Sequence, residues 1–121
     1  MTNCFYKVCE IWPNGSLQSV AAPPRARVKY QIGKRTVPNE GCGPLAVFGS
    51  KGEAVAYMDW YTRHMHNVFE CEAVNVRKPA ESGKIMWSER SYVLSNQYPS
   101  GTLLADAVTL TRELTEEELS S

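Results

Sequence analysis

The chain has 121 residues, of which 43% are hydrophobic and 21% charged, and its 13 basic side chains balance its 13 acidic ones. This length allows one hydrophobic core but not two, so we expect a single domain over residues 1–121. No stretch approaches the roughly 18 consecutive apolar residues of a membrane helix, and a neutral chain has no field to hold duplex DNA. Neither a membrane nor duplex nucleic acid is therefore an expected partner.

The N-terminal segment MTNCFYKVCE lacks the basic start and apolar run of a secretory signal, which predicts a cytoplasmic protein. The four cysteines are Cys4, Cys9, Cys42 and Cys71. They form no C-x-x-C pair, and three of them lie in apolar, strand-like runs. In a reducing compartment this pattern predicts buried thiols and not disulfides or metal ligands.

The first third of the chain reads as a series of short strands. We expect them over residues 4–12, 17–21, 26–33 and 45–48. The dipeptide Asn14-Gly15 between the first two is typical of a tight hairpin turn. The stretch 34–44, which holds three glycines or prolines near its end, is expected to be a loop.

A helix is predicted from Lys51 to about His64. Ser50 and Glu53 have the spacing of a capping box, in which each side chain covers a free backbone N–H of the first turn. The apolar stripe that follows is formed by Ala54, Tyr57, Met58 and Tyr61.

Two further strands are expected, over 67–76 and 101–114. The first alternates acids and valines with Phe69, Cys71 and Ala73, so its inward face is left open. The stretch 85–94 is ambiguous, and 95–101 is expected to be a turn.

The chain ends in a predicted short helix. Thr115 and Glu118 repeat the capping-box spacing, and Leu114 and Leu119 match a hydrophobic staple. The expected fold is therefore α+β, with an antiparallel sheet of about six strands packed against one main helix and a short C-terminal helix.

Arg112 is the charge that the tail strand leaves unexplained. The inward alternation of that strand is Leu104, Asp106, Val108, Leu110 and Arg112. A buried guanidinium without a partner is too costly, so Arg112 must reach past the core, pair with Asp106 or a tail glutamate, or face a ligand. If it faces a ligand, its planar fork of donors suits a phosphate or stacking on a base.

Aromatic and amide side chains precede the tail strand. Trp87, Tyr92 and Tyr98 lie in polar segments where a ring is less needed for core packing, and Asn96 and Gln97 can read the edge of a base. An aromatic platform, an amide and an arginine together favour a nucleotide over a lipid, a metal or a peptide.

The positive charge is unevenly distributed. The run PPRARVKYQIGKR holds Arg25, Arg27, Lys29, Lys34 and Arg35. It is either a solvated strand face or a local site for an anion.

Signals for catalysis are sparse. The common phosphate loops and the nucleophile elbow are absent, and Cys42 lies between two glycines with no flanking base, so neither a cofactor nor a cysteine nucleophile is expected. His64 and His66, two residues apart at a helix end, would not share a face and are not expected to bind a metal together.

A pair of acidic residues supports one enzymatic hypothesis. Glu70 and Glu72, two residues apart on a strand, would face the same side about 7 Å apart. With Arg27 and Ser50 upstream, the order resembles the R-S-E pattern of ADP-ribosyltransferases. The alternative is that both acids simply face solvent.

The order of several segments resembles the small phage proteins that counter Thoeris defence by sequestering cyclic ADP-ribose signals. The segments are the basic strand (26–33), GPLAVF (43–48) before the capped helix, the loop with Met86 and Trp87, the turn with Asn96 and Gln97, and the final LADAVTLTREL (104–114). The resemblance covers most of the chain. It implies a non-enzymatic protein that assembles as a homo-oligomer, a dimer or higher, and encloses a nucleotide.

The same resemblance implies which residues bind the nucleotide. The aromatic residue would be Trp87, the asparagine Asn96 and the C-terminal arginine Arg112. Arg25 or Arg27 would add a phosphate contact.

The leading hypothesis is accordingly a cytoplasmic sponge, in the host cytosol if the chain is viral, that captures a cyclic or ADP-ribose-derived nucleotide without cleaving it. The second hypothesis is an enzyme of the ADP-ribosyltransferase type that uses NAD and Glu72 or Glu70. The third is an interaction module whose exposed strands block a host protein.

Overall fold

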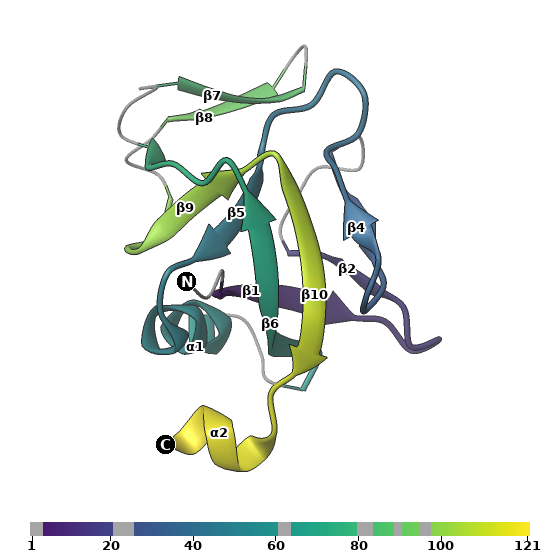
Figure 1. Cartoon of the computed structure of the whole chain (residues 1–121), viewed down its shortest axis with the longest axis vertical. Coiled ribbons are helices and arrows are strands. Elements are labelled where there is room, and N and C mark those ends of the chain that lie inside the picture. The colour runs from purple at the N-terminus through teal and green to yellow at the C-terminus, as the bar shows by residue number, and fades with distance from the viewer. Residues whose placement is uncertain (1–3, 21–25, 61–63, 80–83, 89–90, 95–97) are drawn as a thin grey trace.

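The computed structural model describes residues 4–20, 26–60, 64–79, 84–88, 91–94 and 98–121, with only the backbone described for 84–88 and 91–94 (Figure 1). The strands are β1 (Phe5–Ile11), β2 (Leu17–Ser19), β3 (Lys29–Tyr30), β4 (Arg35–Thr36), β5 (Leu45–Phe48), β6 (His66–Val74), β7 (Lys84–Ser88), β8 (Ser91–Leu94), β9 (Thr102–Ala105) and β10 (Ala107–Glu113). The helices are α1 (Lys51–Trp60) and α2 (Glu116–Ser120). The predicted α+β class, with a large antiparallel sheet, one main helix and a short C-terminal helix, is confirmed.

The main sheet is strongly curved, so that the strands at the two ends of its path approach one another. Its path runs β3, β2, β1, β6, β10, β4, while β5 pairs with both β1 and β9, and β7 pairs with β8 in a separate sheet. The strands at the two ends of the path, β3 and β4, are joined by residues 31–34 alone. Within that connection the Gly33 N–H donates to the Leu110 carbonyl of β10 at 2.8 Å, so the path bends back toward its own start.

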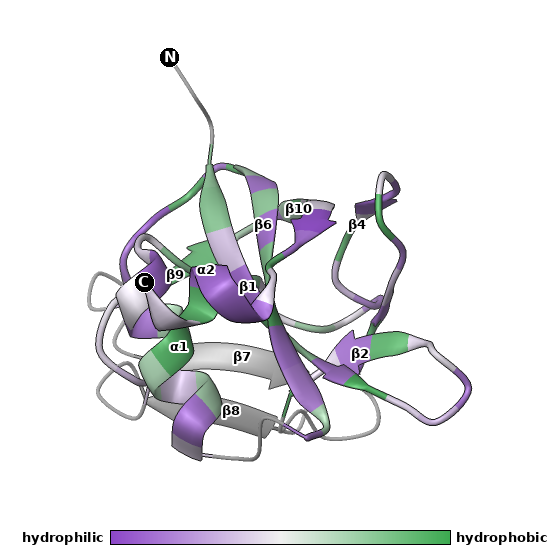
Figure 2. Cartoon of the chain, turned by 90° about the horizontal axis from the view of Figure 1, so that it is seen from below, coloured by the Kyte–Doolittle hydropathy of each residue, from purple (hydrophilic) through white to green (hydrophobic). Residues whose placement is uncertain are grey.

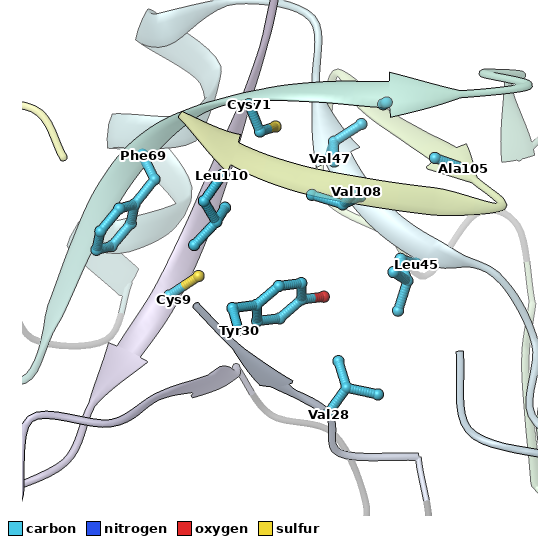
Figure 3. Packing of buried hydrophobic residues seen from close by; sticks show 11 residues of the cluster. Cys9, Val28, Tyr30, Leu45, Val47, Phe69, Cys71, Ala105, Val108 and Leu110 are labelled. Atoms are coloured by element: carbon cyan, nitrogen blue, oxygen red, sulfur yellow. The ribbon is translucent and has the colours of Figure 1, made fainter. Parts of the chain in front are cut away.

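The first core fills the inside of the curl (Figure 3). Its buried members are Cys9, Val28, Tyr30, Leu45, Val47, Phe69, Cys71, Ala73, Ala105, Val108 and Leu110. The second core lies on the other face of β1 and β6, beneath α1. Its buried members are Val8, Phe48, Ala54, Met58, Val68, Leu114 and Leu119.

Strand β6 contributes residues to both cores, so each of its two faces points into one of them. Phe69 and Cys71 point into the first core and Val68 into the second. Further along the strand the second face carries Glu70 and Glu72, so hydrophobic and hydrophilic residues alternate along β6 (Figure 2). Strand β6 is covered on both faces only near its start, at Val68 and Phe69. The helix α1 is too short to cover the rest of the second face, which is exposed at Glu72 and Val74.

A lysine lies inside the first core. Lys7 on β1 is only 7% exposed, and its Nζ donates to the Ala46 carbonyl at 2.5 Å. The ammonium also lies over the ring of Tyr30, 5.3 Å from the ring centroid, a favourable cation–π arrangement. The signal was present in the alternation of Phe5, Lys7 and Cys9 along β1, which places the lysine on the same side as the core cysteine.

Helix α1 begins where predicted and ends earlier. The Ser50 hydroxyl accepts from the Glu53 N–H at 3.2 Å and donates to the Glu53 carboxylate at 2.8 Å, which caps the first turn. The prediction that the helix continues to about His64 is wrong, because α1 ends at Trp60 and the backbone at His64 is a turn. His66 already pairs with Glu10 of β1, so the chain must leave the helix to enter the sheet.

The predicted tail strand is two strands, which is a correction. The chain bends at Asp106, so that β9 pairs with β5 while β10 pairs with β6 and β4. The Asp106 N–H donates to the Val74 carbonyl at 2.9 Å, and its carboxylate accepts from Asn75 and Arg77, each at 3.0 Å. Asp106 is therefore exposed at a bend and does not belong to an inward alternation.

One short element departs from its prediction, and one stretch left ambiguous by the sequence is assigned. Strand β4 lies within 34–44, which was expected to be a loop, and the ambiguous stretch 85–94 falls in the β7–β8 hairpin. Strand β4 has only two residues, and it exists because β10 offers an open edge for Arg35 and Thr36 to pair with. The cysteines follow the prediction in being free, with Cys9 and Cys71 buried and Cys4 and Cys42 half-buried.

We expect two of the four thiols to be unreactive in the folded protein. Burial raises the pKa of both Cys9 and Cys71 to about 12, so neither forms a thiolate at pH 8. Titration with a chromogenic disulfide should modify Cys4 and Cys42 rapidly and the buried pair only after denaturation. Rapid modification of all four thiols would contradict the described burial.

We expect Tyr30→Phe to leave stability unchanged or to raise it by up to about 1 kcal/mol. The phenol oxygen is buried and makes no hydrogen bond of good geometry within the described residues, so its removal leaves the apolar contacts and the Lys7 contact with the ring in place. Tyr30→Ala is the control, and it should lower the free energy of unfolding by about 3 to 5 kcal/mol in urea denaturation. A loss of 2 kcal/mol or more in Tyr30→Phe would show that the hydroxyl is bonded.

Candidate anion-binding site

A one-residue bulge in β10 decides where Arg112 points. Leu110 pairs with Cys71 of β6, and Arg112 pairs with the next residue, Glu70, which leaves Thr111 as the extra residue. The Thr111 hydroxyl donates to the Glu70 carbonyl at 3.0 Å. Because a bulge adds one residue to one strand, Arg112 turns to the face opposite Leu110. The inward direction considered for Arg112 is thereby excluded.

The Arg112 guanidinium binds two carboxylates. Its Nε donates to Glu70 Oε2 at 3.0 Å and its Nη2 to Glu70 Oε1 at 2.9 Å. Its Nη1 donates to Glu118 Oε1 at 2.7 Å and its Nη2 to Glu118 Oε2 at 2.5 Å. The alternative that Arg112 pairs with a tail glutamate is therefore what this structure shows. The arginine side chain nevertheless remains 46% exposed.

These contacts shift the ionisation of the arginine and of one partner in opposite directions. Hydrogen bonds from Arg112, together with the backbone N–H of Thr115, lower the pKa of Glu118 to about 2. Hydrogen bonds to Glu118 and then to Glu70 raise the pKa of Arg112 above its ordinary value. The paired N–H groups of the Arg112 guanidinium thus hold two oxyanions, and the chain itself supplies both.

Helix α2 presents Glu118 to the fork. Thr115 and Glu118 form the predicted capping box, with the Thr115 side chain bonded to the Glu118 N–H and the Glu118 side chain to the Thr115 N–H. The Lys51 ammonium at the start of α1 donates to the Glu118 carbonyl and to the Ser121 hydroxyl, both at 2.7 Å. Leu119 packs into the second core, so α2 is attached by one buried side chain and several surface contacts.

A row of polar side chains borders the fork on the same sheet. Glu72 of β6 lies opposite Thr109 of β10, and Thr109 lies opposite Arg35 of β4. Glu72 and Arg35 are both exposed. Since side chains directly opposite one another share a face, this row adds a second accessible arginine to the face that carries Arg112.

The aromatic candidates lie far from the fork within one chain. Tyr92 of β8 pairs with Met86 of β7, and Trp87 falls at the irregularity that follows. The β7–β8 hairpin lies at the opposite end of the long axis of the molecule from α2 and the end of β10 (Figure 1). The grouping of Trp87 and Tyr92 with Arg112 is thus not made by one subunit, and it stays a prediction that requires a second one.

The remaining predicted ligand residues are placed only in part. Arg25, Asn96 and Gln97 lie outside the described residues. Arg27 is half-buried just before β3, and its carbonyl accepts from the Asn39 amide at 2.9 Å. The structure therefore locates Arg27 and Arg112 and leaves the amide pair open.

The residues of the enzymatic alternative have structural partners. Ser50 caps α1 through Glu53, and Glu70 is bonded to Arg112. Glu72 is exposed on the Arg112 face, as a solvent-facing acid would be. Of the pair, Glu72 is thus the one whose described contacts leave it available to a ligand.

In comparisons with known proteins, no family model, curated protein or solved structure matches the chain. Among the described residues, no helix combines the length and apolar character needed to cross a membrane. In that same part of the chain, no three or more histidine, cysteine, aspartate or glutamate side chains gather as metal ligands would.

We expect Glu118 to titrate near pH 2. Because its folded-state pKa lies below the ordinary 4.5, the pair with Arg112 stabilises α2 fully above pH 4.5, and this contribution is lost as the pH falls from 4.5 toward 2. A carboxyl-carbon NMR titration measures the pKa directly, and Arg112→Gln should return it toward 4.5. A midpoint near 4.5 in the parent protein would contradict the ion pair.

Proposed function

We propose that the protein is a non-enzymatic binding protein that captures an anionic nucleotide of the cyclic ADP-ribose type in the cytoplasm, and that it does so as a homo-oligomer. The observation that carries the proposal is the Arg112 fork. It already binds two carboxylates through paired N–H groups, and this is the geometry that a phosphate group requires. The fork is also accessible, because the Arg112 side chain is 46% exposed.

The need for an oligomer follows from the distance between the two halves of the expected site. The fork and the β7–β8 hairpin lie at opposite ends of one chain (Figure 1). A pocket that buries most of a nucleotide must combine phosphate contacts with a stacking surface. If the Trp87 hairpin of one subunit covers the Arg112 face of another, both contacts are made at once, and a small domain gains a deep pocket at its interface.

The proposal is tested by what the purified protein retains and releases. Native mass spectrometry gives the subunit number, and heat denaturation followed by small-molecule mass spectrometry should return an intact nucleotide. Release of nicotinamide or of a linear product would favour the ADP-ribosyltransferase alternative. In that case Glu72→Gln should abolish NAD consumption, whereas a sponge should tolerate the change.

We expect Arg112→Ala and Trp87→Ala each to weaken nucleotide binding by about 1 to 3 kcal/mol, as is typical for charged hydrogen bonds and for stacking. Isothermal titration calorimetry with cyclic ADP-ribose and ADP-ribose measures both effects. Lys78→Ala is the matched control, because it removes the same charge from an exposed position outside the fork and the polar row beside it. Parent-like affinity in both variants would place the pocket elsewhere, and absence of any nucleotide affinity would favour an interaction module.

A further inference from the structure

The cluster formed by Arg112 and its two carboxylate partners has an excess of negative charge. Two carboxylates share one guanidinium, so the formal charge of the cluster is −1. A guanidinium has five N–H donors, and four donor contacts are already directed at Glu70 and Glu118. A phosphate that approaches this cluster meets net repulsion and finds few donors, unless one of the two acids leaves.

The two acids are not equally able to leave. Glu70 belongs to β6, which is paired with β1 on one side and β10 on the other, so it is held in the middle of the sheet. Glu118 belongs to α2, a helix of five residues at the end of the chain. A helix of that length is unstable alone and depends on its docking contacts. Glu118 is therefore the acid that can move away from Arg112 without disturbing a strand.

Glu118 also has the geometry of a phosphate stand-in. Its two oxygens bind Nη1 and Nη2, the end of the fork, whereas Glu70 binds Nε and Nη2 along its side. Two phosphate oxygens that bind a guanidinium end-on would use the positions that Glu118 now fills.

We propose that Glu118 is a built-in competitor, and that an anionic ligand binds Arg112 by displacing it and releasing α2. In the free protein the fork is then closed by the chain's own carboxylate. This inference rests on the proposed function in that the nucleotide phosphate is the natural competitor, but it applies to any phosphate group of similar size. Linkage requires that the ligand loosen α2 to the same extent that α2 weakens the ligand.

The test uses ADP-ribose and pyrophosphate as probes of the full-length protein. Glu118→Gln should bind both probes about tenfold more tightly, within the usual range of coupling between linked sites. Glu117→Gln is the matched control, since it removes an equal charge from an exposed neighbour on α2, and it should change affinity by less than about twofold. A saturating probe should also accelerate amide hydrogen exchange over 116–120 in the parent protein.

The outcomes separate this inference from the proposed function. If ADP-ribose binds the parent protein but Glu118→Gln has parent affinity and α2 exchange is unchanged, the competitor is disproved and the binding function stands. If neither cyclic ADP-ribose nor ADP-ribose binds, while pyrophosphate accelerates α2 exchange and binds Glu118→Gln more tightly, the inference about Glu118 stands and the nucleotide function fails. If neither probe binds Glu118→Gln, both are wrong, and the Arg112 cluster serves only to dock α2.

Discussion

The pairing of β10 with β6, with its single extra residue at Thr111, is the interaction on which the cores and the candidate site both depend. Before the bulge, Val108 and Leu110 enter the core inside the curled sheet. After it, Arg112 lies beside Glu70, and Leu114 enters the core beneath α1. Without the extra residue, the regular alternation would direct the guanidinium into apolar surroundings, where a charge is not tolerated.

The protein accommodates two cations in opposite ways. Lys7 is buried, and its two partners, a backbone carbonyl and an aromatic ring, are themselves parts of the protein interior. Arg112 is half exposed and bonded to carboxylates, which are the groups that a soluble anion resembles. A ligand can replace a carboxylate partner by exchange of one oxyanion for another, and it has no such route to Lys7. This contrast is why the Arg112 fork is the better candidate for binding.

Local patterns predicted the elements that are stabilised locally. The Asn14-Gly15 turn, the Ser50 cap and the capping box of Thr115 with Glu118 depend on residues at most three positions apart, and each is present. The end of α1, the bend at Asp106 and the short strand β4 were missed because each is set by a partner distant in the sequence. For the candidate site, pairing of Arg112 with a tail glutamate was among the alternatives that the sequence predicted, but its pairing with Glu70 was not.

The sequence alone was enough to predict an α+β fold with free thiols, two capped helices and one arginine that an apolar alternation could not hold. It could not determine which way that arginine points, because a strand's faces interchange when its register shifts by one residue, and the shift at Thr111 is visible only once β10 is paired with β6. The tertiary structure also decided that Glu70, 42 positions earlier in the chain, and Glu118 share the same guanidinium. Contacts of that kind arise from the packing of whole elements, and no local spacing encodes them.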